Sequence, residues 1–478
     1  MGANGDRQAA AAALDATLIG ELPASVEVGA GTVLLLEGRL DPRTRPGTAR
    51  IELAGLSVPP DAERMPEPGG LGPGDRWWLL LELPAAIEPG EYELTIRAEL
   101  EQAPGATARA DLGRVRICAL AAAPPAPSVV ATGPEPLICV CMATHEPDPA
   151  RLEAQIESIR AQDWPEWTCV ISDDASSPQG VAAIERLIEG DGRFHLSRSS
   201  ARLGFYLNFE RALQMAPAEA RWVALADQDD RWDADKLSAL AAPLRSDGVE
   251  LCFSDMRILD EHGALLSDTY WILRRASYDD IASMLVANTV TGAASMFERD
   301  LLETALPFPP PIGEPYHDHW LALCALGLGE IAYVERPLYE RVRHLESVTA
   351  GTRHAEALRA MRDGEQGPAP ERRSARERLA QSPGWRAVYF GRWLQLVQFA
   401  RILLLRGGER IPAPKRAVLH RAIAAERSLA AAGWLGLRSL RPLLGKDETL
   451  ARERVLLGSV LWRRLAGRRL PQRLRRGR

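Results

Sequence analysis

Three aspartates stand within four positions in the stretch LADQDDRW: Asp227, Asp229 and Asp230. They directly follow RWVA, an apolar run that predicts the buried end of a β-strand. Carboxylates this close together repel one another, so the cluster predicts a bound positive charge. Asp227 and Asp229 offer two hard oxygen ligands suited to Mg²⁺ or Mn²⁺, which usually share their shell with substrate phosphates. Asp230 has a second interpretation, as the cap of the following helix.

Strand and helix patterns alternate four times in the region that contains these aspartates. The strands are expected in LICVCMATHE, TCVISDD, FHLSR and RWVALADQDD, and the helices in DPARLEAQIESIRAQDW, PQGVAAIERLIEG, FYLNFERALQMA and ADKLSALAAPL. Asp148 is the expected N-cap of the first helix, with Pro149 in its first turn. This alternation predicts a parallel sheet covered by helices on both faces.

The ends of these expected strands carry the polar residues. Thr144 follows the first strand, Asp173 and Asp174 end the second, and Asp227 ends the fourth. In an open parallel sheet, ligands bind beyond the carboxyl ends of the strands. We therefore expect these side chains to meet at one edge, around a divalent cation that carries a diphosphate.

The chain before this region has a different pattern. Short apolar or alternating runs separated by Gly/Pro turns predict an immunoglobulin-like β-sandwich over residues 25–120. Residues 1–24 are expected to be a flexible N-terminus, and residues 121–136 a proline- and alanine-rich linker. Trp77 and Trp78 are expected in a strand, one in the core and one over an edge, with a carbohydrate-binding surface as the alternative.

The formal net charge of −6 hides a strong asymmetry. Residues 351–478 carry 29 Lys and Arg against 10 Asp and Glu, and their pattern predicts a basic helical region. The last stretch, RERVLLGSVLWRRLAGRRLPQRLRRGR, is amphipathic and favours an anionic membrane surface, although helices packed on the protein are the alternative. Nucleic acid is not an expected partner, because no base-stacking aromatics interleave with these arginines.

Cysteine usage and the N-terminus bear on the compartment. The six cysteines lack the paired spacing of a disulfide framework or zinc site, and most lie in apolar runs. MGANGDRQAA lacks the features of a signal peptide, and no uninterrupted apolar run could span a bilayer. We therefore expect a cytoplasmic protein bound peripherally to the cytoplasmic face of the inner membrane.

Six blocks in order carry a family resemblance: THEPDPARLEAQIESIRAQDWPEW, ISDDASS, RLGFYLNFERAL, LADQDDRWDADKL, NTVTGAASMF and HDHWLAL. They resemble the motifs of family 2 inverting glycosyltransferases, most closely the rhamnosyltransferase-like branch that builds bacterial surface polysaccharides. The resemblance covers roughly half the chain, residues 136–349. It implies a GT-A fold for residues 137–350, an α/β nucleotide-diphospho-sugar transferase domain of Rossmann-like type.

The resemblance also implies a role for each site residue. Asp318, in YHDHW, would be the catalytic base for the acceptor hydroxyl, unless it only pairs with a neighbouring histidine. The DxD motif would bind metal, with Asp229 as the direct ligand and Asp227 nearer the ribose, and His344 would complete the metal shell. The nucleotide site would contain Thr144, Glu146, Asp173, Asp174, Gly204, Asn208 and Asp227. The acceptor and sugar pocket would contain Asn288, Gly292, His317 and Trp320.

Three of these residues have structural alternatives. Asn208 could satisfy backbone groups at a helix start, Trp320 could pack a helix, and His344 could be a structural histidine. The expected function is metal-dependent transfer, with inversion, from a dTDP- or UDP-sugar to a hydroxyl of a lipid-linked glycan. One alternative is a sugar nucleotidyltransferase, but MATHEPDPAR lacks the glycine-rich phosphate loop of that class. The other is a non-catalytic carbohydrate-binding or scaffold protein that works through its sandwich.

Overall fold

The computed structural model divides the chain into two compact units, residues 1–121 with 458–478, and residues 122–457. The described residues are 14–19, 22–23, 25–27, 31–40, 43–44, 47–63, 75–102, 104–118, 124–129, 133–260, 262–271, 278–342, 384–441, 449–450 and 452–466.

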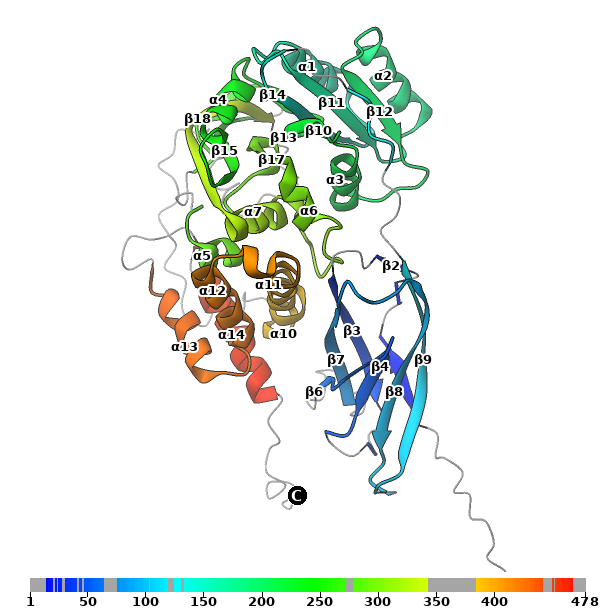
Figure 1. Cartoon of the computed structure of the whole chain (residues 1–478). Helices are drawn as coiled ribbons and strands as arrows, with labels where there is room; N and C mark the ends of the chain where they lie inside the picture. The colour runs from blue at the N-terminus through cyan, green and yellow to red at the C-terminus, as the bar shows by residue number, and fades with distance from the viewer. Residues whose placement is uncertain are drawn as a thin grey trace, which may run out of the picture. The chain divides into compact units, whose positions relative to one another are not determined.

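Two sheets of the first unit enclose one apolar core (Figure 1). The first sheet has the order β1-β3-β7-β6, from Ala16–Leu18, Thr32–Leu40, Asp75–Leu83 and Asp61–Glu63. The second has the order β2-β9-β8-β4-β5, from Ser25–Glu27, Thr107–Cys118, Gly90–Glu99, Arg50–Leu53 and Leu56–Val58. Alternate side chains of both sheets, such as Leu34 and Ile96, point into the shared core. The predicted β structure is therefore present, while its immunoglobulin-like type stays a prediction.

The segment expected to be a flexible N-terminus includes strand β1, Trp77 lies in the core as expected, and the carbohydrate-binding alternative for Trp77 and Trp78 is wrong. Strand β1 pairs antiparallel with β3. Trp77 and Trp78 are both buried, with 1% and 2% of their surface exposed. Trp77 donates its indole N–H to Arg39 O at 3.3 Å, and the Arg463 guanidinium lies 4.2 Å from the Trp78 ring centroid. Neither ring is available to stack on a sugar.

The second unit contains a nine-stranded sheet, with the order β12-β11-β10-β13-β17-β15-β18-β14 and β16 paired to β15. The strands are β10 Leu137–Thr144, β11 Trp167–Asp173, β12 Phe194–Arg198, β13 Ala220–Asp227, β14 Arg231–Trp232, β15 Val249–Leu259, β16 Leu265–Ser267, β17 Ser295–Glu298 and β18 Glu330–Val342. The first four in spatial order run parallel, and β17 is antiparallel to both of its neighbours. The parallel sheet predicted from the strand and helix alternation is confirmed.

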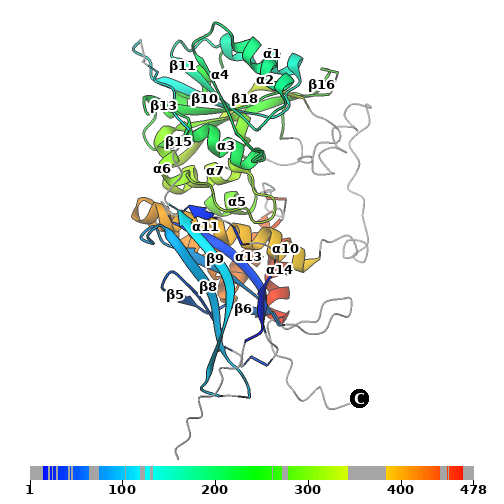
Figure 2. The same cartoon turned by 90° about the vertical axis from the view of Figure 1, so that its right-hand side faces the viewer.

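Helices cover both faces of this sheet. They are α1 Pro149–Arg160, α2 Pro178–Ile188, α3 Phe205–Gln214, α4 Lys236–Leu244, α5 Ile281–Val286, α6 Leu302–Ala305 and α7 His317–Leu328. In Figures 1 and 2, α1, α2 and α4 lie on one face, and α3 and α7 lie on the other. Asp148 caps α1 by accepting from the backbone N–H groups of Ala150 and Arg151, as predicted.

The later helices are α10 Trp385–Val388, a π-turn Tyr389–Trp393, α11 Leu394–Gly407, α12 Ala413–Ala424, α13 Leu429–Arg438 and α14 Arg452–Ala466. Helix α11 packs against α5 and α7 (Figure 1). The Phe399 ring centroid lies 5.3 Å from that of Trp320. Arg406 donates to the carbonyl groups of Thr304, Ala305 and Pro307. Helices α10 to α13 thus share a compact unit with the sheet, and the domain boundary expected at residue 350 stays a prediction. None of the described helices is long and apolar enough to cross a bilayer.

Candidate active site

The carboxyl ends of β10, β11 and β13 lie side by side, as predicted. Thr144 pairs in register with Asp173 on β11, and Ala143 pairs with Asp227 on β13. Thr144 Oγ1 donates to Asp173 Oδ1 at 3.3 Å. The turn that carries Asp229 leads directly into β14, which pairs with β18. The acidic stretch is therefore held between two strands of one sheet.

Lys236 is a buried cation behind this acidic stretch. Its side chain is inaccessible, its Nζ donates to Ala293 O, and Nζ lies 3.7 Å from the Trp232 ring centroid. Burial lowers the pKa of Lys236 to about 7, while the charges of Asp230 and Asp227 act to raise it. The ammonium is therefore held by a carbonyl and an aromatic face, close to the carboxylates but without an ion pair to them in the described residues.

Arg341, on β18, is a second cation at this site. Its burial acts to lower its pKa, but Tyr339, Asp227 and Asp230 together raise the pKa above the usual arginine value. Burial raises the pKa of Asp227, an effect that Arg341 opposes and Asp229 strengthens. The two charges are thus coupled across the end of β13.

Asp230 is buried without a complete set of partners. Its Oδ2 has no hydrogen-bond partner among the described residues, and burial raises its pKa well above the usual range. Helix α4 has Asp235 at its N-cap position, five residues further on. The predicted capping role of Asp230 is therefore wrong, and burial together with the neighbouring carboxylates favours its protonated form.

Asp318 lies in the first turn of α7 and is partly exposed. Its Oδ1 accepts from Asn288 Nδ2 at 3.0 Å, and its Oδ2 accepts from the backbone N–H of Gly292 at 3.3 Å. Burial raises the pKa of Asp318 to about 6. The charge of Arg341 acts to lower this pKa, and the charge of Asp227 acts to raise it. The structure thus brings the predicted base and two predicted pocket residues together, within electrostatic reach of the DxD motif.

His317 shapes this site by packing. Its ring stacks on Phe209 with centroids 3.8 Å apart, and neither ring nitrogen has a partner among the described residues. Burial lowers the pKa of His317 to about 3, so the ring is neutral. A Cβ on Gly292 would lie only 2.7 Å from His317 Nε2, so this close approach requires glycine.

Trp320 and His319 point away from the site. The Trp320 ring is inaccessible, and its indole N–H donates to Ala305 O at 2.8 Å. His319 Nε2 lies 2.8 Å from Met284 O. The expectation that Trp320 lines the sugar pocket is wrong, because its helix turns that face into the core. The alternative in which Asp318 only pairs with a neighbouring histidine is not supported, because the described hydrogen bonds to its carboxylate come from Asn288 and Gly292.

The two aspartates after β11 hold loops. Asp173 has no exposed surface and accepts from the backbone N–H of Ser176 at 3.0 Å. Asp174 is 2% exposed and accepts from the backbone N–H groups of Leu203 and Gly204. Gly204, with φ +81°, starts α3. The expected direct contact of these carboxylates with a nucleoside is therefore corrected: they position the edge of the site.

Asn208 and Glu146 also bind the protein itself. The buried Asn208 amide donates to Thr144 O at 3.2 Å and to Ser172 O at 3.0 Å, which ties β10 to β11. This matches its structural alternative. Glu146 accepts from the backbone N–H of Ser177 at 2.7 Å, at the start of α2. Hydrogen bonds from Ser177 lower the pKa of Glu146.

The charge balance of the site fits a divalent cation. Asp227 and Asp230 interact electrostatically with both Lys236 and Arg341, Asp318 interacts with Arg341, and Asp229 acts on Asp227 and Asp230. With all six groups ionised, the formal charge is −2. No cluster of three or more His, Cys, Asp or Glu side chains suited to a metal occurs among the described residues, and His344 lies outside them. Two carboxylates with diphosphate oxygens are a usual set for Mg²⁺.

Lys236 and Arg341 were not among the predicted site residues. Lys236 belongs to the motif LADQDDRWDADKL, and Arg341 lies three positions before His344. A buried acidic cluster at a strand end needs positive charge nearby. The lysine and arginine residues close to it in the sequence were therefore candidates for the site.

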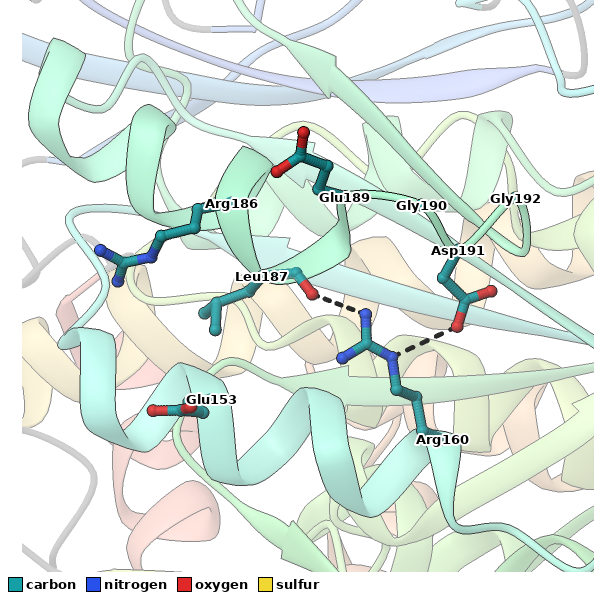
Figure 3. Close-up of a pocket in the computed structure, with 8 residues that line it drawn as sticks. All are labelled: Glu153, Arg160, Arg186, Leu187, Glu189, Gly190, Asp191 and Gly192. Carbon is teal, nitrogen blue, oxygen red and sulfur yellow. Dashed lines mark hydrogen bonds and ion pairs between the residues drawn. The ribbon is translucent and has the colours of Figure 1, made fainter.

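A surface hollow between α1 and α2 is a separate feature (Figure 3). Arg160 crosses it, with its Nε 3.2 Å from Asp191 Oδ2 and its Nη2 2.6 Å from Leu187 O. Asp191 precedes β12, so the hollow lies at the amino end of a parallel strand, whereas the carboxylates above lie at carboxyl ends. The hollow is therefore no part of the candidate active site.

Known proteins provide an independent comparison. Residues 139–306 match the model of Glycosyl transferase family 2. TuaG of Bacillus subtilis (strain 168), a candidate teichuronic acid biosynthesis glycosyltransferase, is 25% identical over 150 residues, which are 31% of this chain and 57% of TuaG. The uncharacterized protein y4gI of Sinorhizobium fredii is 30% identical over 112 residues, 21% of this chain and 11% of that protein. The chain thus spans less than two thirds of either relative.

Solved structures show a weaker likeness. The mannosyltransferase PcManGT from Pyrobaculum calidifontis, in complex with GDP-Man and Mn²⁺, is 20% identical with a TM-score of 0.38, covering 71% of this chain and 88% of that chain. S. aureus TarS 1–349 is 13% identical with a TM-score of 0.37, covering 69% and 92%. These scores are low, so the assignment rests on the sequence match and the observed α/β sheet. Residues 139–306 thus match glycosyl transferase family 2, and the α/β sheet that they form agrees with the fold expected for a glycosyltransferase domain.

Proposed function

We propose that this protein is a metal-dependent inverting glycosyltransferase that uses a dTDP- or UDP-sugar. The observation that carries the proposal is the orientation of the Asp318 carboxylate by Asn288 Nδ2 and the Gly292 N–H, in the same α/β unit as the acidic end of β13. Asp318 has two donors that orient it, and its pKa of about 6 suits a base near neutral pH. The family match of residues 139–306 supports transfer of a sugar.

In the proposed step, the acceptor hydroxyl oxygen forms a bond to the anomeric carbon while the bond from that carbon to the diphosphate breaks. Asp318 takes the hydroxyl proton, and the nucleoside diphosphate leaves with the bonding electron pair. Asn288 and Gly292 hold the Asp318 carboxylate in place. Asp227 and Asp229 would hold Mn²⁺ or Mg²⁺, which supplies Lewis-acid stabilisation of the leaving charge. Attack from the side opposite the leaving group inverts the anomeric configuration.

We further propose that the acceptor is a lipid-linked glycan of bacterial surface polysaccharide synthesis. The similarity to TuaG supports this class of polymer. A rhamnosyl donor follows from the motif resemblance alone, so dTDP-rhamnose belongs in any donor panel.

A surface of the C-terminal helices supports peripheral binding to the cytoplasmic face of the membrane. Leu429, Leu437 and Leu440 are 71%, 72% and 48% exposed, and their spacing places them on one broad side of α13 and its continuation. Arg421 and Arg427 are exposed nearby in the sequence. Apolar side chains together with basic ones fit an anionic lipid surface, because apolar burial and charge attraction add.

A donor panel tests the proposed function. The full chain is incubated with UDP-glucose, UDP-N-acetylglucosamine, GDP-mannose and dTDP-rhamnose, with Mn²⁺ or with EDTA, and nucleoside diphosphate release is measured. We expect release from a dTDP- or UDP-sugar that requires metal, and a fall in turnover of about 10²-fold or more for Asp318→Asn. Full activity of Asp318→Asn, or no release from any donor, would contradict the proposal.

Vesicle flotation tests the membrane proposal. The protein should float with phosphatidylglycerol vesicles and not with phosphatidylcholine vesicles, and added salt should weaken the binding. Leu437→Asp should reduce flotation, whereas Leu265→Asp, at an exposed leucine on β16, should not. Equal flotation of both variants and the wild type would exclude this surface.

A further inference from the structure

Phe205 is an exposed aromatic side chain at the start of α3. It is 53% exposed, while the next residue, Tyr206, is buried and donates its hydroxyl to Pro309 O at 3.1 Å. The backbone before Phe205 is fixed, because Asp174 accepts from the N–H groups of Leu203 and Gly204. The backbone that presents Phe205 to solvent is therefore held in place by hydrogen bonds. Burying the Phe205 ring against a ligand would be favourable, because it removes apolar surface from water.

Tyr316 lies beside Phe205 and next to the candidate base. The two ring centroids are 5.8 Å apart at an interplanar angle of 40°, and Tyr316 is partly exposed. Tyr316 stands two positions before Asp318, and burial together with the charges of Glu314 and Asp318 raises the pKa of its hydroxyl. On the inner side, the Phe205 ring lies 6.4 Å from His317. Two accessible rings thus lie side by side at the start of the helix that carries Asp318.

The position of the Phe205 and Tyr316 rings favours binding of the acceptor glycan over binding of the donor. In an inverting displacement the acceptor hydroxyl approaches opposite the leaving diphosphate, which the DxD motif would hold at the end of β13. The base faces the acceptor, and Tyr316 precedes the helix that carries the base. A half-exposed ring at the rim suits an extended glycan, whereas a donor sugar must be enclosed near its diphosphate.

We propose that Phe205 and Tyr316 form a platform on which a pyranose ring of the acceptor glycan stacks, with its hydroxyl directed to Asp318. This inference rests on the proposed function. The C–H groups on one face of a pyranose carry slight positive charge and pack on the electron-rich face of an aromatic ring. The platform would choose acceptors by the face they present, so hexoses with an uninterrupted C–H face should be favoured.

The experiment compares wild type with Phe205→Leu, Phe205→Trp, Tyr316→Leu and Tyr316→Phe. Leu207→Ala is the matched control, because Leu207 is 38% exposed on the same helix and is not part of the platform. The probes are methyl glycosides of glucose, galactose, N-acetylglucosamine and rhamnose. Binding is measured by saturation-transfer NMR with UDP and Mn²⁺ present, and acceptor and donor KM are measured with the active donor.

We expect a bound glycoside whose ring C–H signals receive saturation. Phe205→Leu and Tyr316→Leu should weaken this binding and raise the acceptor KM about tenfold, a loss of about 1.4 kcal/mol. The donor KM should change much less. Phe205→Trp and Tyr316→Phe should keep the binding because each retains a ring, and Leu207→Ala should match wild type.

Three results would overturn the platform. They are no glycoside binding by wild type, an acceptor KM that does not respond to Phe205→Leu, and a rise in donor KM instead. Failure of the proposed function is distinguishable, since it would show as no turnover of any nucleotide sugar. Glycoside binding that depends on Phe205 would then still support the platform as a sugar site.

Discussion

The backbone N–H of Gly292 donates to Asp318 Oδ2 at 3.3 Å, so the candidate base is oriented by a residue that has no side chain. The same Gly292 lies against His317, where a Cβ would come within 2.7 Å of Nε2. Because position 292 has no side chain, the His317 ring can pack against Gly292 while the Gly292 N–H donates to the Asp318 carboxylate.

We expect Gly292→Ala to lower kcat by about tenfold or more, because its methyl group must displace His317 or the peptide that holds Asp318. The double variant Gly292→Ala/His317→Ala should recover part of the loss, since the clash is removed. Steady-state kinetics measures both. A Gly292→Ala enzyme with wild-type kcat would show that this close approach is not needed.

The rate should depend on pH through Asp318, whose pKa is raised to about 6. The base works when deprotonated, so kcat/KM should fall about tenfold per pH unit below pH 6 and level off above it. Asp318→Asn should remove this limb of the profile. The linked effect on stability has the opposite sign. The folded state holds a proton between about pH 4 and pH 6 that the unfolded state has lost, so stability falls as pH rises through that window.

Metal binding should depend on the DxD carboxylates. Asp229→Ala should abolish the heat of Mn²⁺ binding in the presence of UDP, because one of two carboxylate ligands is lost. Asp300→Asn, at an exposed acid outside the site, is the control. Isothermal calorimetry measures both variants. Unchanged Mn²⁺ binding by Asp229→Ala would remove this residue from the metal site.

Lys236 should stabilise the fold through the acidic cluster. Lys236→Met removes a buried cation, leaves Ala293 O without its donor and should cost about 3 kcal/mol of unfolding free energy. Asp230→Asn should offset part of this cost in the double variant, because Asp230 acts on the lysine through its charge. Urea unfolding of the four proteins gives the coupling. Strict additivity would mean that the two charges are independent.

The α11 helix should be necessary for the stability of the catalytic unit. Phe399 is inaccessible and packs on Trp320, so Phe399→Ala should cost about 3 to 5 kcal/mol. Leu405→Ala, at a 40% exposed leucine of the same helix, should cost far less. Urea unfolding measured by tryptophan fluorescence gives both values. Similar small costs would place α11 outside the cooperative unit.

Local patterns predicted the sheet well. A fully buried parallel strand such as β10 reads as a continuous apolar run, and its period differs clearly from that of α1. Parallel topology then determines which ends meet, so the proximity of Thr144, Asp173 and Asp227 followed from the strand order alone. The Asp148 cap was also local, since its acceptors lie two and three residues away.

Long-range side-chain contacts were not predictable in this way. Asp174 binds a loop 29 residues later in the chain, and only the folded structure reveals that its oxygens are already used. Gln395 and Gln398 form a polar stripe in sequence but are 1% and 0% exposed, because α11 is packed on several sides. Trp320 is of a residue type that often stacks on sugars. The sequence could not show that its ring packs against Phe399 of α11 instead.

The packing of Phe399 and Arg406 against α6 and α7 has a consequence for swapping modules between enzymes. A fragment cut at the end of the family match, residue 306, would lack the proton acceptor at Asp318, and one cut at residue 350 would leave the Trp320 face uncovered. The sheet and helices α10 to α13 all lie within the compact unit of residues 122–457, whereas α14 continues past its end. Chimaeras that exchange substrate preference should therefore carry the downstream helices along with the sheet.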